Sequence, residues 1–127
     1  MSVHESGEMY LEAILVLGKR SGFVRSVDVS AYLGYSKPSV SRAVGILRKE
    51  GYLEVDEDGG LTLTDTGREI AEKIFERHTV LSQVLMRLGV SEETATADAC
   101  RIEHVISDES FRAIQLHQVQ EEKNAGR

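Results

Sequence analysis

Cysteine and long apolar runs are what this sequence has least of. Its single cysteine cannot form an internal disulfide. No apolar run approaches the roughly 18 residues that a membrane-spanning helix needs. The opening residues, MSVHESGEM, lack the basic region and the apolar core of a signal peptide. There is also no internal repeat and no proline- or glycine-rich linker. Because it has neither a signal peptide nor a membrane-spanning run, the sequence predicts a cytoplasmic protein that contacts no membrane.

Charge is distributed unevenly along the chain of 127 residues. The net charge is −6, which by itself argues against a nucleic-acid partner. Residues 19–49, however, contain seven basic residues and one acidic residue, which leaves −12 for the remainder. A local basic face on an acidic protein can still attract DNA phosphates. A solvated surface with randomly clustered charges is the alternative.

Three helices are predicted in the first part of the chain. Residues 6–18 carry apolar side chains at helical spacing, and Gly18 or Gly22 can end this helix. Ser26 is expected to cap a short second helix that Gly34 closes. Ser36 is expected to cap a third helix, which has a basic outer face and stops at Gly51. This arrangement matches a helix-turn-helix and predicts binding to double-stranded DNA. The candidate DNA-contacting residues are Arg25, Ser36, Lys37, Pro38, Ser39, Ser41, Arg42 and Lys49.

Two runs of alternating residues follow the third helix. YLEV and LTLT flank DEDGG and predict a hairpin, which would be the wing of a winged helix or a cover for one side of the core. Thr64 then caps a long helix near residues 65–88 that Gly89 ends. Another helix begins at Ser91, with the apolar stripe Ala95, Ala99, Ile102 and Ile106. Asp108 is expected to cap a last helix, with a frayed tail at residues 121–127.

The predicted fold is mostly α with a small β-hairpin wing. We expect a winged-helix DNA-binding domain at residues 1–68, and a connector helix with a helical dimerisation domain at residues 69–127. The second domain is too small to cover its own isoleucine, leucine and phenylalanine side chains. Residues 75–120 are therefore expected to form a homodimer. A dimer also suits a palindromic operator with two half-sites.

The stretch ACRIEHVISDES, residues 99–110, contains the single cysteine. In a continuous helix, Cys100, Glu103 and His104 would share one face. Thiolate, carboxylate and imidazole are common metal ligands. The alternative is a buried cysteine beside two surface polar residues. The residues alone leave both interpretations open.

Five motifs occur in an order and at separations that resemble a known family. They are GEMYLEAI, SKPSVSRAVGILRKEGYLE, LTLTDTGREIA, RHTVL and ACRIEHVISDE, and they cover roughly residues 6–118. They resemble the diphtheria-toxin-repressor family of metal-dependent transcriptional repressors, which includes the manganese-transport regulators. The resemblance implies a winged-helix domain, a helical dimerisation domain and a metal site between them.

The resemblance also implies a ligand set that combines two branches of this family. The residues that match the primary site of the iron-responsive branch are Met9, Cys100, Glu103 and His104. The residues that match ligands of the manganese-responsive branch are Glu12 and His78. Ser82 and Thr96 stand where the iron branch has ligands of an ancillary site, so the number of metal ions stays open. Many iron-branch members continue into a third, SH3-like domain where this sequence stops.

Met9 and Cys100 replace carboxylates of the manganese branch with softer sulfur donors. This exchange predicts Fe(II) as the activating metal, with Mn(II) as the alternative and Co(II), Ni(II) or Zn(II) as possible substitutes in vitro. No small organic ligand is expected. The sequence has no HExxH or other catalytic motif, which argues against a metalloenzyme. A winged-helix regulator that responds to oxidation of Cys100 is a further alternative, although no second cysteine is present to resolve it. His4 and His117 are expected to be surface residues.

Overall fold

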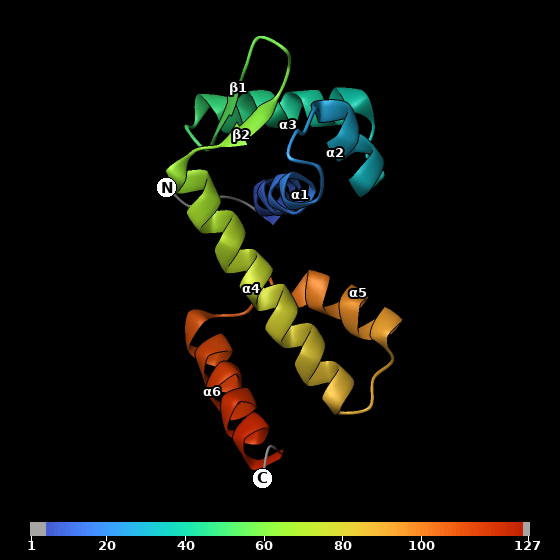
Figure 1. The fold of residues 1–127 in the computed structure, drawn as a ribbon, viewed down its shortest axis with the longest axis vertical. Helices are drawn as coiled ribbons and strands as arrows, with labels where there is room; N and C mark the ends of the chain where they lie inside the picture. The colour runs from blue at the N-terminus through green and yellow to red at the C-terminus, as the bar shows by residue number, and fades with distance from the viewer. Residues whose placement is uncertain (1–4, 126–127) are drawn as a thin grey trace. The chain divides into compact units, whose positions relative to one another are not determined.

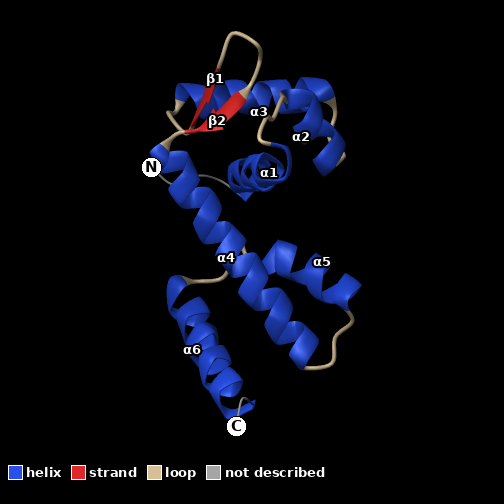
Figure 2. Ribbon diagram, viewed as in Figure 1, coloured by secondary structure: helices blue, strands red, loops and turns tan. Residues whose placement is uncertain are grey.

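The computed structural model describes residues 5–125, and Figure 1 shows its elements. In chain order they are α1 (Glu5–Ser21), α2 (Ser26–Leu33), α3 (Lys37–Lys49), β1 (Leu53–Val55), β2 (Leu61–Leu63), α4 (Asp65–Arg87), α5 (Glu92–Ile102) and α6 (Asp108–Ala125). Helices dominate and a single hairpin is seen within these residues, as Figure 2 shows by colour, so the predicted fold class is confirmed. None of the described helices is long and apolar enough to cross a membrane.

The chain forms two compact units, which divide between Lys73 and Ile74. The division falls inside α4, so the first turns of this helix belong to the first unit and its remainder to the second. The domain boundary expected between residues 68 and 69 stays a prediction.

The helix signals of the first unit are mostly confirmed. α1 ends at Ser21, directly before Gly22, which is the later of its two predicted stops. Gly34 closes α2 in the left-handed conformation with φ 74°, which glycine adopts without a steric penalty. The predicted Ser26 cap is wrong, because Arg25 is the N-cap and its backbone N–H donates to Asp28 Oδ2 at 2.9 Å. An acidic side chain at the third helical position satisfies this backbone group and leaves Ser26 as the first residue of the helix.

α3 forms as the sequence predicts. The Ser36 side chain accepts a hydrogen bond from the Ser39 backbone N–H at 3.3 Å, and a proline occupies the first turn. Its inward stripe is buried and consists of Val40, Val44 and Leu47. The other large buried residues of the first unit are Tyr10, Leu11, Ile14, Leu15, Val24, Val29, Tyr52, Leu53, Leu61 and Leu63. The opposite face of α3 is therefore left to solvent or to a partner.

The hairpin is both a wing and part of the core of the first unit. β1 and β2 are antiparallel, with Leu53 opposite Leu63 and Glu54 opposite Thr62. The two leucines are buried, whereas Glu54 and Thr62 are exposed. In the connecting loop, Asp56 Oδ1 accepts hydrogen bonds from two backbone N–H groups at 2.9 and 2.7 Å. This aspartate shapes the turn that joins the strands.

α4 begins where the sequence predicts, with Thr64 as its cap. Thr64 Oγ1 accepts from the Gly67 N–H at 3.1 Å and donates to the Gly51 carbonyl oxygen at 2.7 Å. Gly67 itself is required here, because a Cβ at this position would lie 1.9 Å from the Tyr52 carbonyl oxygen. The first turn of α4 is thus packed directly against the backbone that leads into the hairpin.

The second unit follows its predicted order, with three corrections. Ser91 caps α5 as expected, with its hydroxyl 3.3 Å from the Thr94 N–H. α6 is capped by Ser107 rather than by Asp108, because the Ser107 hydroxyl accepts from the Ser110 N–H at 3.1 Å. The tail is not frayed over residues 121–125, since α6 continues to Ala125. The third correction concerns the end of α5 and is described with the site below.

The core of the second unit is small. Leu81, Ala99 and Phe111 are its buried members, and the partly buried residues packed against them are Val80, Ile102, Ile106 and Ile114. The buried polar or charged residues of the unit are Arg77, Ser82, Glu103 and Gln118. Its exposed large apolar residues are Met86, Leu88, Val105, Leu116 and Val119. Leu88 was expected within the helix near residues 65–88, but α4 ends at Arg87 and Leu88 lies outside it.

Candidate metal centre and nucleic-acid interface

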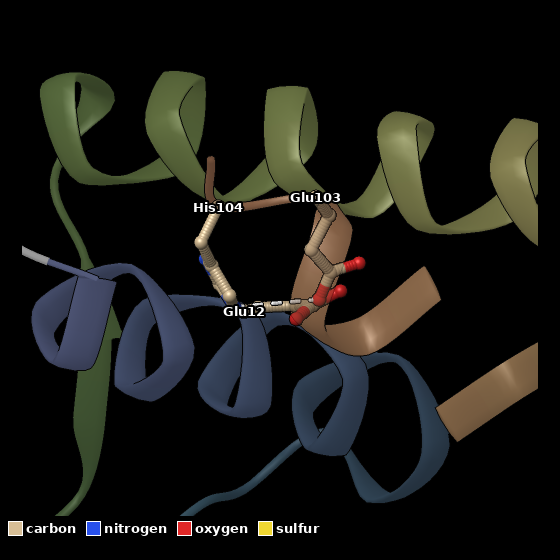
Figure 3. Close-up of side chains that lie close together, drawn as sticks. All are labelled: Glu12, Glu103 and His104. Carbon is tan, nitrogen blue, oxygen red and sulfur yellow. Dashed lines mark ion pairs between the residues drawn. The ribbon is translucent and has the colours of Figure 1, made fainter. Parts of the chain in front are cut away.

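Glu103 is the centre of the candidate metal site in the second unit. It is the residue after the last helical residue of α5, and it is 0% exposed. Its Oε2 lies 3.0 Å from His78 Nδ1, and its Oε1 lies 3.5 Å from His104 Nε2. Figure 3 shows the side chains of Glu103 and His104 at the turn that follows α5. The structure therefore brings together a buried carboxylate and two imidazoles from α4 and this turn.

This arrangement fits a divalent cation. Burying a carboxylate is costly unless its oxygens are paired. Among the described residues, Glu103 Oε1 accepts no hydrogen bond, although it is fully buried. Imidazole nitrogen and carboxylate oxygen are donors that Fe(II), Mn(II) and Zn(II) accept. A cation here would satisfy the orphaned oxygen together with the neighbouring imidazoles.

Cys100, Glu103 and His104 do not share the face of one continuous helix, contrary to what their spacing predicted. α5 ends at Ile102, so His104 lies in the turn rather than on the helix. Glu103 keeps helical dihedral angles, with φ −57° and ψ −27°, so it still follows Cys100 by one helical turn. Cys100 is half-buried on α5. The alternative of two surface polar residues is wrong, because the side chains of Glu103 and His104 are only 0% and 4% exposed.

The two ligand candidates of the first unit lie on α1. Met9 is half-buried, and its Sδ accepts a hydrogen bond from Tyr35 Oη at 3.0 Å. The Tyr35 ring also packs edge-on against Tyr10, with centroids 5.9 Å apart. Burial raises the pKa of Tyr10 above its ordinary value, and the neighbouring Tyr35 adds to this. Glu12 follows Met9 by three residues on the same helix and is half-buried (Figure 3).

Seven of the eight candidate DNA-contacting residues lie on α3 or at its N-cap, whereas Arg25 is the N-cap of α2. All except the partly buried Ser39 are exposed. Arg42 Nη2 donates to Ser39 Oγ at 3.4 Å, and Ser39 Oγ also accepts from Ser36 Oγ at 2.9 Å. The Arg25 guanidinium lies 5.0 Å from the centre of the Phe23 ring. The structure thus presents an exposed basic helix with short polar side chains in its first turn. This arrangement suits contact with a DNA groove.

Two family models cover most of the chain. The model of an iron dependent repressor N-terminal DNA binding domain matches residues 2–61. The model of an iron dependent repressor metal binding and dimerisation domain matches residues 64–118. The chain belongs to the iron-dependent repressor family. Its members are DNA-binding transcriptional repressors rather than enzymes, and the family resemblance of the sequence motifs is confirmed.

The chain is similar to named transcriptional regulators and to a solved manganese-dependent repressor. The chain is 37% identical over 107 residues to the transcriptional regulator MntR of Escherichia coli O6:H1, covering 84% of this chain and 69% of the relative. It is 37% identical over 118 residues to MntR of Lysinibacillus sphaericus, covering 92% and 85%. A solved manganese-dependent transcriptional repressor complex with manganese matches with a TM-score of 0.81 and 26% identity, covering 87% of this chain and 51% of the other. The chain spans about half the length of the solved repressors it matches.

One residue beside the candidate metal donors is not indicated by the sequence. Arg77 is buried on α4 next to His78 and binds the turn that carries Glu103. An arginine within a polar stretch of a long helix resembles a surface residue, and nothing in its spacing indicates burial. Of the other histidines, His117 is exposed as expected, and His4 lies outside the described residues.

Proposed function

We propose that this chain is a repressor that binds operator DNA in response to a divalent transition metal. The observation that carries the proposal is the fully buried Glu103 carboxylate, which lies between His78 and His104 in the unit that matches a metal-binding and dimerisation domain. An imidazole on each side of a buried carboxylate is a poor arrangement for packing alone. It is a good one for a cation.

The proposed ligands are Met9, Glu12, His78, Cys100, Glu103 and His104. When bound, a divalent ion supplies positive charge and several coordination positions. Met9 and Glu12 anchor α1, which packs within the DNA-binding unit, whereas the other four donors anchor α4, α5 and the turn after α5. Donors from both units acting together restrict the movement of the DNA-binding unit.

This restriction raises DNA affinity to the extent that the liganded arrangement is the one that fits the operator. The coupling is reciprocal, because DNA must raise metal affinity by the same factor. Two copies of the chain, joined through residues 75–120, would present two α3 helices to a palindromic operator. The exposed apolar side chains of the second unit, which include Val105, Leu116 and Val119, support such a dimer.

Fe(II) is our proposed physiological activator. The thioether of Met9 and the thiol of Cys100 are softer donors than carboxylates, and Mn(II) benefits least from such donors. Mn(II) is the second candidate, because the relatives at 37% identity are named MntR. The hydrogen bond from Tyr35 to the Met9 thioether also supports it, since that bond competes with metal coordination by the same sulfur.

The test is an anaerobic titration of Fe(II), Mn(II), Co(II), Ni(II) and Zn(II) against the DNA upstream of the protein's own gene. Metal-dependent retardation that a chelator reverses supports the proposal. Retardation that depends on redox state and resists chelators favours a Cys100 switch instead. A double variant, Met9→Asp with Cys100→Glu, should move the preference from Fe(II) toward Mn(II). If the wild type already responds to Mn(II) better than to Fe(II), the manganese candidate replaces the iron one.

A further inference from the structure

Arg77 is a buried charged residue whose acceptors all lie in one place. It is in the middle of α4 and is 6% exposed. A buried guanidinium is tolerated only where its N–H groups find acceptors. The acceptors of Arg77 lie on the segment between α5 and α6 and at the start of α6. That segment also carries Glu103 and His104, the donors at the centre of the proposed metal site.

The guanidinium holds this segment at several points. Nη1 donates to the backbone carbonyl oxygens of Glu103 at 3.2 Å and Ile106 at 2.7 Å. Nη2 donates to the carboxylate of Asp108. The guanidinium carbon lies 5.5 Å from the centre of the Phe111 ring. The planar fork of one arginine therefore fixes the end of α5 relative to the start of α6.

Two adjacent residues of α4 contact the backbone and the side chain of Glu103. Arg77 binds its backbone carbonyl oxygen, while His78 Nδ1 lies 3.0 Å from its carboxylate. Residues that contact metal ligands without touching the metal fix the direction of the donor atoms. We propose that Arg77 is a positioning residue for the metal donors of the second unit. It fixes the backbone of the turn so that the side chains of Glu103 and His104 converge. This inference rests on the proposed function and extends it to a residue that is not itself a ligand.

The test compares Arg77→Lys with wild type in the full chain, using Co(II) alone as the probe. Lysine keeps the charge and the aliphatic stem, but its single ammonium cannot hold three acceptors in the plane of a guanidinium. We expect the Co(II) dissociation constant to rise about 10- to 100-fold. We also expect the visible spectrum of bound Co(II) to change, since the donors no longer converge as before. Helical content and sedimentation show whether the variant remains folded.

Arg87→Lys is the matched control. Arg87 lies on the same helix, is 46% exposed and approaches Glu122 at 3.4 Å, away from the proposed donors. It should leave the Co(II) affinity and spectrum unchanged. A folded Arg77→Lys protein with wild-type affinity and spectrum would overturn the inference and leave the proposed function standing. A wild type that binds none of Fe(II), Co(II) and Mn(II) under anaerobic conditions would instead overturn the proposed function.

A second variant covers the case in which Arg77→Lys does not fold. Asp108→Asn removes the ionic contact of Arg77, while the backbone carbonyl oxygens of Glu103 and Ile106 are unaltered. A positioning role predicts weaker Co(II) binding and a spectral change in Asp108→Asn. A purely structural role predicts lower stability with an unchanged Co(II) spectrum, and that result would overturn the inference.

Discussion

The two units of the chain bury different kinds of residue. Among residues 5–73, the buried positions are apolar, aromatic or glycine. Among residues 74–125, a small apolar core is accompanied by the buried polar residues Arg77, Ser82, Glu103 and Gln118. The first unit can thus be stabilised by its own apolar burial. The second buries a carboxylate, which suits a bound cation, and exposes apolar side chains, which suit a partner surface.

The tyrosines of the chain allow the unfolding of the first unit to be followed separately from that of the second. All four of its tyrosines, Tyr10, Tyr32, Tyr35 and Tyr52, lie in the first unit, and the sequence contains no tryptophan. Tyrosine fluorescence therefore follows the first unit alone, whereas circular dichroism at 222 nm follows the helices of both. Differences between the two signals during unfolding show how far the units behave independently.

The largest expected effect is that of Glu103→Gln. The amide keeps the shape of the side chain but removes the negative charge that the proposed cation needs. We expect the metal concentration for half-maximal DNA binding to rise by ~100-fold or more. This exceeds the loss in metal affinity expected for a residue that contacts a ligand without touching the metal. Urea unfolding and helical content of the metal-free protein show whether the variant remains folded, because Glu103 also contacts His78 and His104.

Glu109→Gln is the control for this change. Glu109 is exposed on α6, so its metal response should equal that of wild type. If Glu103→Gln responds to metal as wild type does, the buried carboxylate has a packing role and the contrast between the units loses its functional meaning.

A pair of glycine variants tests the packing of the first unit. Gly67→Ala places a Cβ 1.9 Å from the Tyr52 carbonyl oxygen and should cost about 2–3 kcal/mol of unfolding free energy. Gly45→Ala, in α3, meets no atom within 4 Å and should stabilise the helix by about 0.5–1 kcal/mol. Urea unfolding followed by tyrosine fluorescence measures both. Equal stability of the two variants would contradict the close contact between Gly67 and the hairpin.

Arg42→Ala tests whether the basic surface of the first unit binds DNA. Arg42 is exposed on α3, and its loss should weaken operator binding by about 1–3 kcal/mol if it contacts a base edge. In that case discrimination at one base position is also relaxed. A uniform loss, with the salt slope lower by about one, would instead identify a phosphate contact. Arg112→Ala, on the exposed surface of α6, is the control, and an equal loss in both variants would contradict the assignment of DNA binding to α3.

The smallest expected effects come from removing the same cap in each unit. The hydroxyls of Ser36 and Ser91 each accept from a backbone N–H at 3.3 Å, at the start of α3 and α5. Each change to alanine should cost about 1 kcal/mol. If the units unfold separately, only Ser36→Ala shifts the transition followed by tyrosine fluorescence. A shift of that transition in Ser91→Ala would show that the units unfold together.

The features that the sequence predicts correctly depend on neighbouring residues. Ser36, Thr64 and Ser91 cap the helices expected of them, because a cap needs only its own side chain and the next three backbone groups. The hairpin follows for the same reason, since two alternating runs around a turn determine the pairing. The predicted caps at Ser26 and Asp108 are wrong because other residues take these roles. Arg25 is the N-cap of α2 and is held by Asp28, and Ser107 accepts the hydrogen bond at the start of α6.

The features that could not be predicted depend on distant residues. The burial of Glu103 and Arg77 results from packing between α4 and the turn after α5, which are more than twenty residues apart in sequence. No glycine or proline lies between Ile102 and the start of α6 to indicate that α5 ends at Ile102. The hydrogen bond between Tyr35 and Met9 likewise joins α1 to the turn before α3. The candidate donors therefore come from the motifs and stay a prediction, whereas their burial and their contacts required the structure.

The central claim is that metal donors on both units act together to raise DNA affinity. Glu12→Gln tests it most directly, because it removes a proposed donor of the first unit and leaves those of the second in place. The measurement is operator affinity with and without saturating Co(II), beside Glu5→Gln as an exposed control on α1. The account predicts that Glu12→Gln still binds Co(II), more weakly, but that Co(II) no longer raises its affinity for DNA. A full gain in DNA affinity on adding Co(II) to Glu12→Gln would contradict the account.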